Sequence, residues 1–178
     1  MKYLTQLITV FTLVIMSPAL AQELDTEGSS VLVLGTSTLH DWEMNAEDIK
    51  GSLIMENDEL QVIEFQAIVE GIKSGKSKMD KLAYKAFDYE NNPNISFRAE
   101  EIDIDGENAT LKGVLGIAGK SNEVSIPLKM TKNEAYLNFK GSYTLKMTDY
   151  GMTPPTAVFG TIKTGDEITV EFDLNYKQ

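Results

Sequence analysis

The sequence predicts an all-β fold, a single antiparallel sheet that curls into a barrel and carries one amphipathic helix. In many segments apolar and polar residues alternate at period two, which places their side chains on opposite faces of a strand. Short stretches of turn-forming residues separate these segments, as in sheets whose neighbouring strands follow each other along the chain. A single segment instead repeats its apolar residues at helical spacing. A sheet of this kind hides its apolar face by curling, so the barrel has the form of a container.

Residues 1–21 have the features of a secretory signal peptide and lie outside the predicted fold. A positively charged start precedes an apolar run, and residues 19–21 form a small-x-small cleavage site. Cleavage after Ala21 leaves one domain, residues 22–178, exported most simply to a bacterial periplasm. Because Gln22 follows the cleavage site, the mature protein is not expected to be a lipoprotein, and the absence of cysteine excludes disulfides.

The N-terminal half of this domain contains three strand segments. Residues 30–34 are a short apolar run, expected either to be buried on both sides or to lie at the seam where the sheet closes. Residues 43–55 alternate weakly, with Gly51 at a bend. Residues 60–71 alternate clearly, with Phe65 on the apolar face.

Residues 77–89 form the predicted helix, which we expect to pack at or near one end of the barrel. Ser77, with Asp80 three residues later, suits a capping box at the start, and residues 91–93 end the helix. The apolar side chains recur at i, i+3, i+4, i+7 and i+8 and so share one face: Met79, Leu82, Ala83, Ala86 and Phe87.

The C-terminal half returns to strands. The apolar positions change parity within residues 95–104, which predicts a β-bulge near Glu100 or Glu101. The strand segments that follow are residues 111–118, 124–130, 135–139 and 168–176. Turns are expected at residues 105–106, 119–122 and 164–166. The residues predicted to line the barrel interior and contact a ligand occupy apolar positions of the strands: Phe65, Phe97, Leu115, Ile117, Leu137, Phe139 and Phe172.

The balance of charge and the single histidine limit the chemistry. The chain has 27 acidic and 16 basic residues and a net charge of −11, which disfavours nucleic acid as a partner. His40 stands alone, so a multi-histidine metal site is excluded, and no cofactor is expected. In an extended chain His40 and its neighbour Asp41 point to opposite faces, which argues against an aspartate–histidine relay. We therefore predict a protein that is not an enzyme, with a hydrolase or isomerase using these two residues as the weaker alternative.

Trp42, the only tryptophan, is open to two interpretations. It either plugs the core at the end of the barrel, or it forms a wall or lid of a ligand cavity. In the second case the nearby His40 is a further candidate for contact with the ligand.

Five lysines gather within thirteen residues that contain a single acid, Asp80. They are Lys73, Lys76, Lys78, Lys81 and Lys85. One interpretation is an ordinary solvated helix face. The other is a cationic lip beside the tunnel entrance, which meets an anionic headgroup or makes transient contact with a membrane surface.

Several stretches follow one another in a recognisable order and spacing. They are GTSTLHDW (residues 35–42), KSG (73–75), MDK (79–81), NPNISF (92–97), GVLGIAG (113–119), MTDYGMTPPT (147–156) and GTIKTGD (160–166). Together they resemble the YceI-like family, the lipocalin-like, polyisoprenoid-binding proteins of bacteria. The LHDW version resembles a periplasmic branch of that family found in Bacteroidetes-type organisms.

The resemblance implies an eight-stranded, lipocalin-like antiparallel β-barrel with one helix, enclosing an elongated apolar tunnel. It also implies isoprenoid chains, such as quinone tails or polyprenyl carriers, as ligands. The predicted function is that of a periplasmic carrier that holds such a lipid in the tunnel. A filled barrel that acts as an envelope stress or interaction protein, without a small-molecule ligand, is the alternative. The sequence leaves open the identity of the lipid and the oligomeric state.

Overall fold

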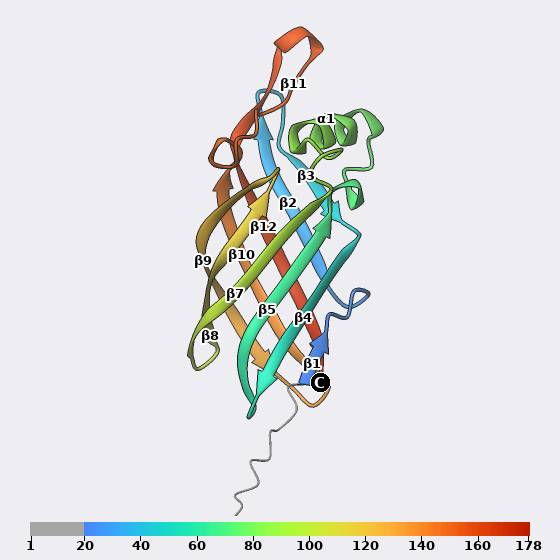
Figure 1. Ribbon diagram of the computed structural model, residues 1–178. Coiled ribbons are helices and arrows are strands. Elements are labelled where there is room, and N and C mark those ends of the chain that lie inside the picture. Colours follow the sequence, from blue (N-terminus) through green and yellow to red (C-terminus); the bar gives the residue numbers. More distant parts are fainter. Residues whose placement is uncertain (1–19) are drawn as a thin grey trace, which may run out of the picture.

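The computed structural model describes residues 20–178 (Figure 1). This part of the chain is an all-β fold with one α-helix, as the sequence predicts. The predicted signal peptide lies outside the described residues, apart from Leu20 and Ala21. These two residues begin strand β1 (Leu20–Glu23), which pairs with β4 (Ile49–Glu56). Cleavage after Ala21 therefore stays a prediction.

The described residues form twelve strands, which belong to one curled antiparallel sheet. Besides β1 and β4 they are β2 (Ser30–Ser37), β3 (Trp42–Ala46), β5 (Glu59–Ile68), β6 (Ile72–Lys73), β7 (Asn94–Asp105), β8 (Asn108–Ile117), β9 (Lys120–Lys132), β10 (Tyr136–Lys146), β11 (Thr156–Ala157) and β12 (Ile162–Lys177). Eight of the twelve have eight residues or more and build the wall of the barrel. These eight agree with the eight-stranded barrel that the resemblance implies, and four further strands of two to five residues add to the count.

The sheet curls far enough for its two sides to meet. The strand order is β1-β4-β5-β7-β8-β9-β10-β12-β2-β3-β6, with β11 paired to β12. Leu24, directly after β1, donates its backbone N–H to the carbonyl of Gly51 in β4 at 2.9 Å. On its other side Leu24 pairs with Tyr176 of β12. The short β1 segment therefore connects β4 to the end of β12 and helps to enclose an apolar interior.

Burial along the strands follows the predicted alternation. In β9, for example, Val124, Ile126 and Leu128 are buried and the residues between them are exposed. The pairing of β7 with β8 shifts register between Ala99 and Glu101, which confirms the predicted bulge.

The predicted turn at residues 164–166 was wrong, because these residues belong to β12. The pairing of β12 with β2 shifts register between Thr164 and Ile168, so the chain bulges and continues along the sheet. Glycine and aspartate within a strand mark such a bulge as readily as they mark a turn.

The helix α1 (Ser77–Phe87) begins where the sequence predicts and ends at Phe87, two residues earlier than predicted. The next residue, Asp88, has a left-handed backbone that stops the helix. The predicted capping box was wrong. The carboxylate of Asp80 instead accepts hydrogen bonds from the backbone N–H (2.8 Å) and hydroxyl (2.6 Å) of Ser74 in the preceding loop. This pair fastens α1 across one end of the barrel, as the sequence predicts for its position (Figure 1).

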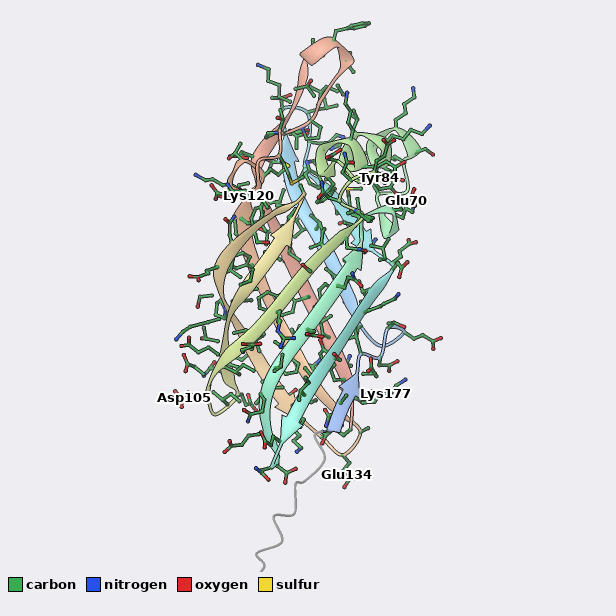
Figure 2. All side chains as sticks on the ribbon, viewed as in Figure 1. Glu70, Tyr84, Asp105, Lys120, Glu134 and Lys177 are labelled. Atoms are coloured by element: carbon green, nitrogen blue, oxygen red, sulfur yellow. The ribbon has the colours of Figure 1, made fainter. Side chains whose placement is uncertain are left out.

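The barrel has two distinct ends, which we call the helix end and the far end. Figure 2 shows Tyr84 of α1 and Glu70 at the helix end, with Asp105 and Lys177 at the far end. The interior of the far half is filled by large side chains, among them Tyr176, which is fully buried. No helix within residues 20–178 is long and apolar enough to cross a membrane.

Candidate functional site

A cavity of about 640 Å³ lies between α1 and the helix end of the barrel, and we call it the outer chamber. The apolar face of α1 forms one wall, so that this face borders a void rather than a packed core. The opposite walls come from β2, β3, the 3₁₀ helix η2 (Met147–Tyr150) and the segment around β11. Four of the lining residues are methionines: Met44, Met79, Met147 and Met152. Methionine is flexible and polarizable, so these walls can adapt to an irregular apolar ligand.

A second cavity of about 130 Å³, the inner chamber, lies within the barrel. Apolar and aromatic side chains line it completely. Four residues border both chambers: Val33, Ile72, Phe87 and Ile168. The two chambers therefore adjoin, and together they extend from the helix end into the barrel.

Six of the seven residues predicted to line the interior lie on the wall of the inner chamber: Phe65, Phe97, Leu115, Ile117, Phe139 and Phe172. Leu137 lines neither chamber, although it is buried. It pairs with Tyr176 near the far end, where aromatic side chains already occupy the interior. Strand parity gives the face on which a residue lies but not its height along the barrel. Leu137 lies on the predicted face, but too close to the far end to border a chamber.

The structure places Trp42 in the wall of the outer chamber, which agrees with the second interpretation of this residue. The indole Nε1–H donates to the carbonyl of Thr36 at 2.9 Å. The ring lies so close to Gly35 that a Cβ there would be 2.1 Å from Trp42 Cζ2. Glycine at this position of β2 thus creates the space that the indole occupies.

His40 also borders the outer chamber, at its exposed rim. Its Nδ1 is 2.6 Å from the backbone carbonyl of Asp41 and donates a hydrogen bond to it. Within residues 20–178 no carboxylate is hydrogen-bonded to the imidazole, and no cluster of potential metal ligands occurs. The arrangement therefore lacks the carboxylate partner that orients a catalytic histidine.

The five lysines of the predicted lip separate into two pairs and one single residue. Lys76 and Lys78 line the outer chamber, and Lys81 and Lys85 are exposed on α1 without lining it. Lys73 lies apart from the lip, because its Nζ–H donates to the hydroxyl of Tyr84 at 2.7 Å. This hydrogen bond raises the pKa of Lys73 and ties α1 to β6.

Asp166 fixes the η2 wall of the outer chamber to β12. Its carboxylate accepts hydrogen bonds from the hydroxyl (2.6 Å) and the backbone N–H (2.9 Å) of Thr148. These bonds lower the pKa of Asp166 below its ordinary value of 3.8. Met147, which lines the chamber, directly precedes Thr148, so the ionised carboxylate holds this part of the wall in place.

The prediction from sequence missed most of the outer chamber. The helix stripe was recognised, but it was interpreted as a face that packs on the barrel. Met44, Met147 and Met152 were not selected at all. Their shared residue type was the available signal, because methionines clustered around one space favour an adaptable binding surface.

Comparison with known proteins identifies relatives of this fold. The structure is similar to BcnA of Burkholderia cenocepacia, with a TM-score of 0.74 and 17% identity over 85% of this chain and 98% of that one. A polyisoprenoid binding domain from Saccharophagus degradans, implicated in plant cell wall breakdown, has a TM-score of 0.71 and 11% identity over 88% and 97% of the two chains. The YceI protein of Campylobacter jejuni has a TM-score of 0.63 and 14% identity over 98% and 93%.

At these identities the solved structures show the fold alone. No curated protein sequence matches this chain. The model of the YceI-like domain, however, matches residues 22–176, which is nearly the whole chain beyond the predicted signal peptide. The chain therefore belongs to the YceI-like family.

Proposed function

We propose that this protein is a periplasmic carrier that holds a long apolar lipid, with an isoprenoid chain as the best candidate, in its two adjoining chambers. The observation that carries the proposal is the wholly apolar inner chamber, which continues into the larger, methionine-lined outer chamber. Membership of the YceI-like family supports it, as does similarity to a domain described as polyisoprenoid binding.

The two volumes set how much of a lipid tail the chambers can enclose. At about 30 Å³ for each carbon-sized group, the outer chamber accommodates about twenty groups and the inner chamber about four. Burial of twenty methylene-sized groups contributes about 16 kcal/mol. Association costs about 4 to 15 kcal/mol, so micromolar affinity, about −8 kcal/mol, lies within reach without any charged contact.

The distribution of polar groups gives the ligand an orientation. The polar residues that border the cavities lie at the outer chamber, among them His40, Lys76 and Thr164, and the inner chamber offers no polar surface. A neutral or anionic headgroup therefore stays at the rim, and the tail points into the barrel. Within residues 20–178 the His40 imidazole has no carboxylate partner and the chambers are largely apolar, so we propose a carrier rather than an enzyme.

The filled far half of the barrel favours one rival, an envelope stress or interaction protein without a small-molecule ligand. Phe139 and Tyr176, both fully buried, pack edge to face with ring centroids 5.6 Å apart and close the interior there. This rival requires the outer chamber to hold solvent only.

Lipid extraction and native mass spectrometry of protein purified from its own host test the carrier. We expect a co-purified apolar lipid, or uptake of an added fluorescent polyprenol or long-tailed quinone. Ala83→Trp places a large ring in the outer chamber and should weaken that uptake at least about tenfold, because the ring occupies the space of the tail. Lys85→Trp is the matched control, since it adds the same ring to the exposed face of α1. Absence of any lipid and of any uptake by the unaltered protein would contradict the carrier and favour its rival.

A further inference from the structure

An apolar tip projects from the helix end of the molecule. It belongs to the hairpin in which β11 pairs with the start of β12, and its turn is the 3₁₀ segment η3 (Val158–Gly160). Figure 1 shows this hairpin extending beyond the barrel at the same end as α1. Phe159 is fully exposed, and Val158 is 62% exposed. Leu39, in the turn between β2 and β3, is 65% exposed.

Hydrogen bonds from neighbouring residues hold the apolar tip in a defined conformation. Both Val158 (φ 48°) and Phe159 (φ 55°) have left-handed backbones, which are uncommon for such side chains and are retained where surrounding structure holds them. The carbonyl of Val158 accepts hydrogen bonds from the hydroxyl (2.8 Å) and the N–H (3.2 Å) of Thr161. Thr38, next to Leu39, donates its N–H to the carbonyl of Lys163 at 2.9 Å. The turn that carries Leu39 is therefore fastened to the hairpin that carries Phe159.

The same hairpin and turn form the mouth of the outer chamber. Pro155, Ala157 and Ile162 of the hairpin line the chamber together with Leu39. Lys78, on the first turn of α1, lines it from the other side. The exposed apolar side chains and the helix thus flank one opening.

The charge at this mouth is opposite to that of the whole molecule. Four exposed lysines belong to α1 and the residue before it, and Lys163 is exposed on the hairpin. The one acid of that helical segment, Asp80, is hydrogen-bonded to Ser74, and Asp41 is an exposed acid of the neighbouring turn. The chain as a whole carries a net charge of −11. An anionic membrane therefore repels the body of the protein and attracts the lysines at this mouth.

We infer that Leu39, Val158 and Phe159 insert into the interface of a lipid bilayer that contains anionic phospholipids, while the α1 lysines contact its headgroups. This geometry opens the outer chamber onto the bilayer, so that an apolar tail passes between them without crossing water. The purpose of the docking rests on the proposed carrier function. The docking itself needs no ligand in the chamber, so the two can fail separately.

Co-flotation of the purified protein with vesicles tests the docking. We expect binding to vesicles of phosphatidylethanolamine and phosphatidylglycerol, and much weaker binding to pure phosphatidylcholine. Phe159→Ser should lower the partition coefficient about tenfold, since it removes the largest inserted apolar surface. Ile104→Ser is the matched control. Ile104 is also a large exposed apolar residue, at 48%, but it adjoins Asp105 at the far end (Figure 2).

The lysines give a second, salt-sensitive effect. The triple variant Lys78→Gln, Lys81→Gln and Lys85→Gln should bind anionic vesicles roughly tenfold more weakly than the unaltered protein at low salt. At 1 M salt, where the screening length is about 3 Å, the two should differ by less than about twofold. Identical binding of the two proteins at low salt would show that these lysines do not contact the membrane and form an ordinary solvated helix face.

A direct probe of insertion uses the absence of cysteine from the chain. Phe159→Cys and Ile104→Cys each provide a single site for an environment-sensitive dye. We expect a blue shift of the dye at position 159 when anionic vesicles are added, and none at position 104. Equal responses, or equal flotation of the two serine variants, would overturn the docking.

A stable dimer of the unaltered protein that Phe159→Ser dissociates, with no vesicle binding, would also overturn it and would assign the tip to contact between copies. Uptake of a polyprenol from ethanol that survives in Phe159→Ser would leave the carrier intact in either case.

Discussion

The two halves of the barrel use the same apolar strand face in different ways. In the far half large side chains meet across the interior, and Phe139, Tyr176 and Leu53 are fully buried. At the helix end the facing residues are small or flexible, as with Ala83 and Met79 of α1, and a chamber of about 640 Å³ remains. The inner chamber between these regions measures about 130 Å³.

This difference means that the far half contributes mainly to the stability of the fold and the helix end mainly to ligand binding. Close packing stabilises a core because each side chain has partners on every side, whereas side chains that border a void have lost part of those contacts already. We therefore expect substitutions in the far half to change the free energy of unfolding, and substitutions around the outer chamber to change the affinity for an apolar ligand.

The largest expected effect compares one residue from each region. Leu53→Ala should lower the free energy of unfolding by about 2 to 5 kcal/mol, because Leu53 is fully buried, borders neither chamber and would leave a cavity in packed surroundings. Met79→Ala, in the chamber wall, should lower it by about 1 kcal/mol or less and weaken uptake of a polyprenol. Urea unfolding of both variants measures the contrast. Equal losses of stability would mean that the helix end is packed as closely as the far half.

Gly35→Ala tests the wall of the outer chamber alone. The added methyl group would lie 2.1 Å from Trp42, so the indole has to leave its position. We expect a cost of about 1 to 3 kcal/mol from overpacking and a change in the emission of Trp42, the only tryptophan. Gly116→Ala is the control, since its methyl group would meet mainly the movable hydroxyl of Ser96. Unchanged emission in Gly35→Ala would refute the position of the indole against β2.

Asp166→Asn should change the free energy of unfolding least, and its effect should depend on pH. Hydrogen bonds from Thr148 lower the pKa of Asp166 in the folded protein below 3.8, so the stability that they contribute is present above pH 3.8. It is lost as the pH falls through the lower, folded pKa. We therefore expect Asp166→Asn to be less stable than the unaltered protein at pH 7 in urea unfolding, and this difference to shrink as the pH falls below 3.8. A difference that stays constant down to pH 2 would contradict the role of the carboxylate.

The sequence was a good guide wherever structure depends on neighbouring residues. Alternation at period two predicted the long strands, and the parity change near Glu100 predicted the bulge, because a strand projects successive side chains to opposite faces by local geometry alone. The helical spacing predicted α1 for the same reason. The predicted start at Ser77 is also confirmed, although the capping box from which it was predicted does not form. The same pattern also placed all seven proposed lining residues on the interior face of the sheet, and six of them border the inner chamber.

Tertiary structure decided where the interior is filled and where it is open. Leu137 and Phe139 have the same parity on β10, yet only Phe139 borders a chamber, because height along the barrel depends on how distant strands align. The outer chamber is made by Met44, Met79 and Met147, which lie far apart in the chain. A void is a property of which side chains fail to meet across space, and no local pattern in the sequence records that.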